Sequence, residues 1–193
     1  MSNTVENKIY TYADYLSYPE GEHIEIIEGH IYNMSPAPSR IHQEIISELI
    51  TVINSYIKSS KGNCKVYPAP FDVILKDDNE EIVNSRNVIQ PDISVICDKN
   101  KLTDKGCTGA PDMIIEVVSP FNPSSDYIRK LNLYDQYKVR EYWIVNPMKQ
   151  TILVYTLDEN TNQYAAPEAY TFKDKIKVGI YDNLEIDFNV LDL

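Results

Sequence analysis

The stretch PDMIIEVVSP, residues 111–120, decides the fold that the sequence predicts. Within it, MIIEVVS places apolar residues on both faces of a strand, and such a strand belongs in the interior of a sheet. Glu116 is the exception in this run. A buried carboxylate is costly unless a cation or hydrogen-bond donors compensate its charge, so Glu116 needs a specific partner.

The sequence on both sides of this stretch predicts helices and further strands. Residues 39–57 repeat apolar side chains at helical spacing, and a second helix is expected from Ser124 or Ser125 to about Lys138. A hairpin is expected around Glu28-Gly29, and further strands are expected in CKVYPAPFDVILKD, VIQPDISVICD, EYWIVNP, TILVYTL and NLEIDFNVLDL. With no internal repeat or low-complexity linker, this order predicts one α/β (α+β) domain over residues 1–193, with a mixed sheet flanked by helices.

Composition limits the class of protein. The net charge of −11 argues against a broad basic surface for nucleic acid, although a nuclease site itself collects carboxylates to hold a metal. No run reaches the length of a membrane span, and the first ten residues are too polar for a secretory signal. Cys64, Cys97 and Cys107 lack metal-ligand spacing, and we expect free thiols in a cytoplasmic protein.

Asp92, in QPDISVICD, is the second carboxylate of interest. If this segment lies beside the Glu116 strand, we expect the two carboxylates on adjacent strands, close enough to share one ion. Mg²⁺ suits such a site because it prefers oxygen ligands and keeps several waters, and we expect Mn²⁺ to substitute for it. The alternative is structural, since an aspartate after proline commonly begins a strand and Glu116 could pair with a lysine.

A lysine follows in the second predicted helix. Asp126, Lys130 and Tyr134 share one helix face, and the helix begins just after the Glu116 strand. Lys130 would then either point its ammonium at the carboxylates or form a solvent-exposed pair with Asp126. Aromatic residues here are expected to pack helix against sheet rather than to stack on bases: Tyr134, Tyr137, Tyr142 and Trp143.

The PD and EVV pattern resembles a variant of the PD-(D/E)xK nuclease signature, with Val118 where the lysine normally stands. More specifically, the chain resembles the large bacterial Uma-type family of candidate restriction endonucleases. The resemblance covers residues 10–147 and rests on the order and spacing of several segments: YTYADYLSYPEG, IEIIEGHIYNMSPAPSRIHQEI, QPDISVI, PDMIIEVVSP, the Asp126, Lys130 and Tyr134 spacing, and VREYWIVNP.

This resemblance implies a restriction-endonuclease-like fold and a Mg²⁺-dependent endonuclease. It implies hydrolysis of phosphodiester bonds through a metal-activated water, in DNA more than in RNA. Asp92 and Glu116 would be metal ligands together with the backbone carbonyl of Val117, and Glu44 matches a position where related nucleases often carry another acidic ligand. Lys130 would replace the missing strand lysine, which completes a catalytic set of Asp92, Glu116 and Lys130.

Other positions of the resemblance leave alternatives open. His42 either acts as a general base or bonds to a neighbouring loop as a helix-start histidine. Lys138 stands where the family often has glycine, and Asn146 where it often has aspartate, which affects only local turns. We expect Lys130→Ala to leave folding and metal binding nearly intact while it removes most of the cleavage activity.

The alternative function is a non-catalytic nucleic-acid-binding or regulatory domain that retains the fold. The acidic composition favours this alternative, whereas the set of Asp92, Glu116 and Lys130 favours the enzyme. We also expect a homodimer. Cutting both strands of a duplex requires two sites, and a second copy adds contact surface to a small acidic protein.

Overall fold

The computed structural model describes residues 8–19, 21–22, 24–34, 39–119 and 124–193, without the side chains of residues 124–126. Its largest sheet has seven strands, with β9 (Met113–Val117) in the interior as predicted. β9 pairs in parallel with β10 (Glu141–Asn146) and antiparallel with β6 (Ile93–Ile96), so the sheet is mixed. The remaining strands extend it on both sides: β3 (Lys65–Pro68), β11 (Thr151–Asp158), β12 (Gln163–Tyr164) and β13 (Glu168–Thr171).

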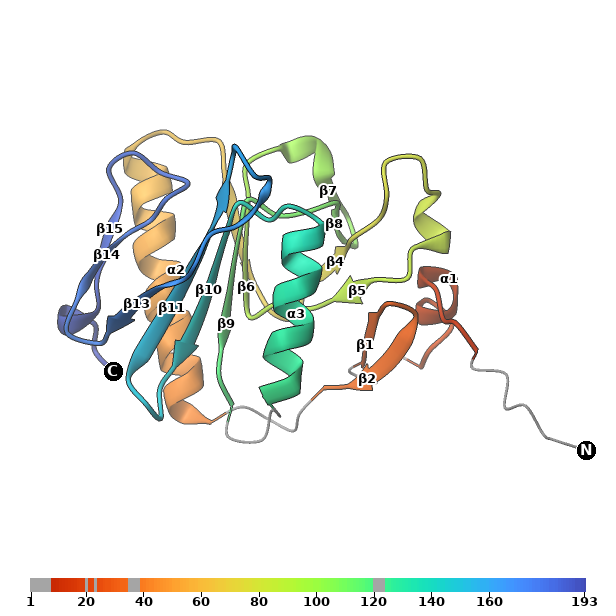
Figure 1. The fold of residues 1–193 in the computed structure, drawn as a ribbon, viewed down its shortest axis with the longest axis horizontal. Coiled ribbons are helices and arrows are strands. Elements are labelled where there is room, and N and C mark those ends of the chain that lie inside the picture. The colour runs from red at the N-terminus through yellow and green to blue at the C-terminus, as the bar shows by residue number, and fades with distance from the viewer. Residues whose placement is uncertain (1–7, 20, 23, 35–38, 120–123) are drawn as a thin grey trace, which may run out of the picture.

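Two helices cover opposite faces of this sheet (Figure 1). α2 (Arg40–Ser59) begins after Ser39, whose hydroxyl oxygen accepts a hydrogen bond from the N–H of His42, as is typical of a helix N-cap. Its apolar stripe packs in one cluster with Ile115 and Trp143. α3 (Ser124–Gln136) packs in another cluster with Ile114, on the other face. Alternate residues of β9 therefore face different helices.

A second sheet of six strands carries the predicted hairpin. In the hairpin, β1 (Ile24–Ile27) and β2 (His30–Asn33) are joined by Glu28-Gly29, which have φ angles of 51° and 79°. Positive φ at both positions is characteristic of a tight two-residue turn. The other elements of this part of the chain are α1 (Tyr12–Tyr15), β4 (Asp72–Ile74), η1 (Ile82–Asn84), β5 (Val88–Ile89), η2 (Lys99–Lys101), β7 (Leu102–Thr103) and β8 (Gly106–Thr108).

Two segments that we expected to form strands, the first of them interrupted by its prolines, are each divided between the two sheets. CKVYPAPFDVILKD forms β3 in the large sheet and β4 in the small one, and VIQPDISVICD forms β5 in the small sheet and β6 in the large one. A proline interrupts each segment, because it lacks the N–H that would continue a ladder. The second break, at residues 90–92, places Asp92 where the chain passes between the sheets.

The C-terminal segment adds a small hairpin over α2 (Figure 1). β14 (Lys175–Lys177) pairs with β15 (Glu185–Asp187). The expected strand in NLEIDFNVLDL is therefore shorter than predicted, because η3 (Phe188–Val190) follows it directly. The carboxylate of Asp187 caps this turn by accepting a hydrogen bond from the N–H of Asn189.

The expectation of three free thiols is wrong for two of them. Cys64 and Cys97 form a disulfide, whereas Cys107 is free and buried. The reason is strand register. Cys64 directly precedes β3 and Cys97 directly follows β6, and these antiparallel strands pair Lys65 with Ile96, so the two cysteines meet at the end of the ladder.

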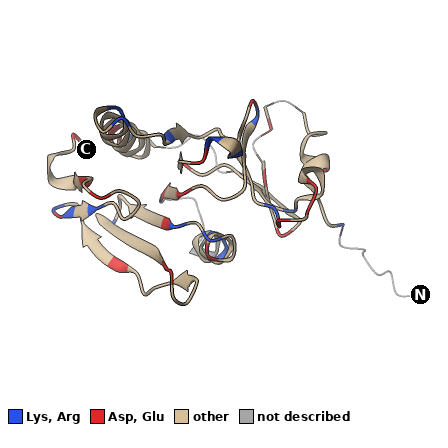
Figure 2. Ribbon diagram, turned by 90° about the horizontal axis from the view of Figure 1, so that it is seen from above, with Lys and Arg blue, Asp and Glu red and all other residues tan. Residues whose placement is uncertain are grey.

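Charge is distributed rather than gathered into one region. Figure 2 shows acidic and basic residues interspersed over the described elements, in keeping with the excess of acidic residues in the sequence. Within the described part of the chain, the helices are too short or too polar to cross a bilayer.

Candidate active site

Glu116 lies on β9 with its side chain directed toward α3. Only 7% of the residue is exposed. Its Oε1 accepts hydrogen bonds from the Lys130 ammonium at 3.0 Å and from the Tyr134 hydroxyl at 2.8 Å. Lys130 and Tyr134 are one helical turn apart on α3, so the shared face that the sequence predicts is directed at this carboxylate. The partners that the buried Glu116 requires are therefore Lys130 and Tyr134, both from α3.

Lys130 also joins the two sheets. Its ammonium lies 3.0 Å from Oε1 of Glu25 on β1, and the lysine is 5% exposed. The same oxygen of Glu25 accepts a hydrogen bond from the backbone N–H of Gln90 at 2.9 Å. Sequence reasoning missed Glu25, although IEII shows the signal that drew attention to Glu116, which is one carboxylate within an otherwise apolar strand.

Asp92 also contacts β9, and it does so from the side of the neighbouring strand β6. It directly precedes β6, and its Oδ2 accepts a hydrogen bond from the backbone N–H of Val117 at 2.7 Å. Nε2 of His42, on α2, lies 3.3 Å from the same oxygen. Glu116 lies on β9, and Asp92 directly precedes β6, the strand beside it. The Asp92 carboxylate contacts the backbone of β9 and His42 of α2, and its charge acts on Glu116. The expectation that the two carboxylates share one ion stays a prediction.

The electrostatics of Glu116 reflect an excess of negative charge. Burial raises the pKa of Glu116, and the charges of Asp92 and Glu25 raise it further, against the opposing effect of Lys130. The single ammonium of Lys130 is thus shared by two glutamates, with a third carboxylate within electrostatic range. The charges of Asp92 and Glu25 disfavour the ionised form of Glu116, and a cation bound beside it would favour that form.

His42 is held within the same charged region. Burial alone would lower the pKa of His42, but the hydrogen bond to Asp92, the Asp92 charge, the backbone of Val117 and the Glu116 charge together raise it above its ordinary value. The histidine therefore helps to orient the Asp92 carboxylate. The sequence left two roles for His42, a general base or a helix-start histidine bonded to a neighbouring loop. The structure shows the contact of His42 with Asp92, which corresponds to the second role.

Glu44 and Asp126, two further residues named from the sequence, are not seen at the Glu116 carboxylate in the described part of the chain. Glu44 pairs with Arg40, one turn earlier on α2, and its side chain is 33% exposed. Its role as a metal ligand stays a prediction. The side chain of Asp126 lies outside the described residues, so its predicted pairing with Lys130 is untested.

The available donors fit a hard cation that retains water. Among the described residues, no group of three or more histidine, cysteine, aspartate or glutamate side chains is placed to enclose a metal. Mg²⁺ does not need such an enclosure, because one or two carboxylates and several waters satisfy it. Asp92 and Glu116 supply the carboxylates, and the backbone at Val117 lies between them. A soft metal with nitrogen or sulfur preference is not matched by this oxygen-rich set.

Comparison with a solved structure supports this fold. A crystal structure of an Anabaena variabilis protein, described as "a putative nuclease belonging to DUF820", superposes with a TM-score of 0.74 at 22% identity, covering 94% of this chain and 96% of that one. This likeness shows a restriction-endonuclease-like fold.

Sequence comparison finds a relative and a family. A Synechocystis sp. protein described as "Uncharacterized protein slr1290" is 28% identical over 143 residues, which is 73% of this chain and 65% of that protein, so the match leaves about a third of the relative uncovered. The model of the Uma2 family, described as "Putative restriction endonuclease", matches residues 12–189. The chain therefore belongs to the Uma2 family.

Proposed function

We propose that this protein is a metal-dependent endonuclease that hydrolyses phosphodiester bonds, in DNA more than in RNA. The observation that carries the proposal is the convergence of three groups on the end of β9. Asp92 and Glu116 come from adjacent strands, and the ammonium of Lys130 comes from the following helix. Membership of a family described as a "Putative restriction endonuclease" supports the same reaction class.

In this proposal Asp92 and Glu116 hold Mg²⁺, or Mn²⁺ in its place, together with the backbone carbonyl of Val117. When bound, such a cation lowers the pKa of a water and balances negative charge on a phosphate. His42 orients the Asp92 carboxylate through the contact with Oδ2. Tyr134 fixes the position of the Glu116 carboxylate by donating to Oε1.

Lys130 supplies positive charge where the reaction builds negative charge on phosphate. Two glutamates and burial restrict its ammonium to one place, so little reorganisation is required when a substrate binds. The lysine stands in for the one that the usual signature places at position 118, which is a buried valine here. A helix residue thus takes the place of a strand residue.

The experiment that tests the function is cleavage of labelled DNA and RNA by purified protein with Mg²⁺, with Mn²⁺ and with a chelator. We expect cleavage that requires the metal, favours DNA and is lost in Asp92→Asn. Asp182→Asn is the matched control, since Asp182 is exposed in the turn between β14 and β15. Metal-independent cleavage, or equal cleavage by wild type and Asp92→Asn, would contradict the proposal.

The net charge of −11 favours a second candidate function, a non-catalytic nucleic-acid-binding or regulatory domain. Binding of nucleic acid without cleavage in the same assay would select it. We further propose a homodimer, because cutting both strands requires two sites. Light scattering over a wide concentration range, with and without DNA, should give twice the mass of the chain, and a constant monomer mass would contradict this assembly.

A further inference from the structure

The disulfide between Cys64 and Cys97 is not used by the chemistry above. The two cysteines face each other because β3 and β6 pair Lys65 with Ile96, at one end of a ladder of four residue pairs. β3 stands at one end of the seven-stranded order, and both cysteines are half-buried at the edge of the apolar cluster that includes α2. Exposed Lys65 and Asp98 flank them, so small thiols in solution have access to the bond.

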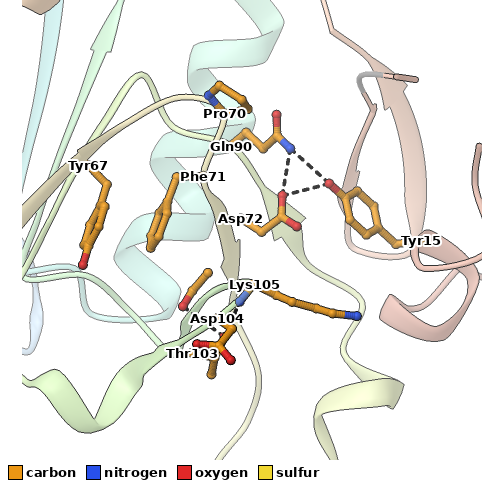
Figure 3. A pocket seen from close by; sticks show the side chains of 10 residues that line it. Tyr15, Tyr67, Pro70, Phe71, Asp72, Gln90, Thr103, Asp104 and Lys105 are labelled. Carbon is orange, nitrogen blue, oxygen red and sulfur yellow. Dashed lines mark hydrogen bonds between the residues drawn. The ribbon is translucent and has the colours of Figure 1, made fainter. Parts of the chain in front are cut away.

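The position of Cys64 is fixed by contacts other than the disulfide. The N–H of Gly62 donates to the carbonyl of Ile57, five residues earlier, at 2.8 Å, which ends α2 in the manner of a Schellman motif. The chain then enters β3 directly after Cys64. Further along this strand, the Tyr67 ring stacks on Phe71 with centroids 4.3 Å apart, and the two rings lie side by side in Figure 3. Both ends of β3 are therefore anchored without the disulfide.

Cys97 is held in the same way. Its backbone N–H donates to Oδ2 of Asp112 at 2.7 Å, and Asp112 directly precedes β9, the next strand of the sheet. At the other end of β6, the carbonyl of Asp92 accepts a hydrogen bond from the N–H of Ala69 at 3.1 Å, which closes the ladder there. Reduction of the disulfide would thus leave two thiols that face each other, ready to form the bond again.

The size of the core distinguishes this disulfide from those of small secreted domains. Such domains rely on disulfides because they cannot build a sufficient core. Here apolar clusters cover both faces of the large sheet, and we expect the fold to persist when the bond is open. Disulfides that are accessible from solution are typically the labile and regulatory ones.

The bond also joins two elements that hold the candidate site. α2 and β6 pack in one apolar cluster. His42, near the start of α2, contacts Asp92, which directly precedes β6, whereas Cys64 follows α2 and Cys97 follows β6. The disulfide is therefore at the far ends of the two elements whose near ends hold the Asp92 carboxylate.

We propose that Cys64 and Cys97 are a reversible thiol–disulfide pair, which a small disulfide such as glutathione disulfide closes and a small thiol opens. In the closing reaction, the thiolate of one cysteine attacks a sulfur of glutathione disulfide, which forms a mixed disulfide and releases one glutathione. The other cysteine then attacks the protein sulfur of the mixed disulfide and releases the second glutathione. Two cysteine thiols are oxidised, glutathione disulfide is reduced to two thiols, and the two cysteine protons pass to these thiols.

The test is equilibration of the folded protein in glutathione buffers, followed by alkylation of free thiols and measurement of the intact mass. We expect two alkyl groups per chain in reduced glutathione and none in oxidised glutathione, because Cys107 is buried in the folded chain. Cys64→Ser should stop at the mixed disulfide and carry one bound glutathione. Cys107→Ser is the matched control and should open and close as wild type does.

Thermal unfolding measures the consequence of closing the bond. We expect closed wild type to unfold at least about 5 °C above the open form, because the bond restricts the unfolded chain. Cys64→Ser should unfold at the temperature of open wild type, and circular dichroism establishes that it and open wild type are folded.

Three results would overturn this inference. A bond that stays closed in reduced glutathione would be a static cross-link. Two alkylated thiols in oxidised glutathione would show that the cysteines do not pair, and loss of the fold on reduction would show that the bond cannot open in the native protein. The inference does not depend on the proposed nuclease, which the cleavage assay tests separately.

Discussion

Glu116 and Glu141 are buried glutamates on neighbouring strands of one sheet, yet their surroundings differ in kind. Glu141 accepts hydrogen bonds from the indole N–H of Trp143 at 2.7 Å and from the backbone N–H of Ile180 at 2.8 Å, which are neutral donors. Glu116 shares one ammonium with a second glutamate and has a third carboxylate nearby. Burial raises the pKa of both.

The difference lies in what satisfies each charge. The donors around Glu141 tie the C-terminal segment to β10, and each is in place within the folded chain. Around Glu116, two further carboxylates disfavour its ionised form, and a cation bound at this strand end would favour it. A buried carboxylate is thus evidence for function only when its partners are themselves charged and shared.

The largest expected effect is on stability, from Lys130→Ala. The structure changes our sequence-based expectation that folding would be nearly intact, because Lys130 is buried and its loss leaves Glu25 and Glu116 without their cation. Breaking a buried pair in this way costs about 3–5 kcal/mol of the free energy of unfolding. Urea unfolding measures it, with exposed Lys177→Ala as the control. A loss no larger than that of the control would show that the cluster is not a buried ion pair.

The second effect is on cleavage, and it separates charge from packing. Lys130→Met keeps much of the side-chain volume and removes the ammonium. We expect the cleavage rate of folded protein to fall by about a hundredfold or more, since removal of a preorganised charge that stabilises the transition state costs this much. Initial rates on a DNA oligonucleotide measure it, and Lys177→Met is the control. If the cleavage rate of Lys130→Met equalled that of wild type, Lys130 would have only a structural role.

Glu141→Gln should have the opposite profile. An amide has one acceptor oxygen and carries an NH₂ group, so at least one of the neutral donors loses its partner, at a cost of about 1–3 kcal/mol of unfolding free energy. The cleavage rate per folded molecule should stay at the wild-type value. Paired urea unfolding and rate measurements test both statements, and a rate loss like that of Lys130→Met would erase the distinction between the two glutamates.

The smallest expected effect concerns Lys138, in the turn between α3 and β10. Its φ is 61°, a left-handed conformation that glycine adopts without strain, which explains why the family often has glycine here. Lys138→Gly should raise the free energy of unfolding by no more than about 1 kcal/mol and leave cleavage unchanged. Urea unfolding would contradict this if the variant were clearly less stable than wild type.

The sequence predicted the large elements well, because their signals are local. The helical spacing of residues 39–57 corresponds to α2, the two-faced apolar run corresponds to β9, and Glu28-Gly29 forms the hairpin turn. The sequence did not predict which sheet a strand joins, because tertiary structure determines it. Strand-like segments around Pro70 and Pro91 are divided between two sheets, and a sequence window contains no information on which sheet each half joins.

The candidate site was only partly predictable for the same reason. Glu116 and Lys130 are close in sequence, so a strand followed by a helix was enough to predict their meeting. Glu25 is 105 residues away from Lys130, and only the pairing of two sheets brings it there. The contact between His42 and Asp92 likewise depends on how α2 packs against β9, which no local pattern specifies.

Calorimetric titration of Mn²⁺ into wild type, Glu116→Gln and Glu141→Gln tests the metal site. We expect one site in wild type, binding weakened by about tenfold or more in Glu116→Gln, and wild-type binding in Glu141→Gln, because only Glu116 is proposed as a ligand. Absence of binding by wild type, or equal affinities in wild type and Glu116→Gln, would contradict the proposed metal site.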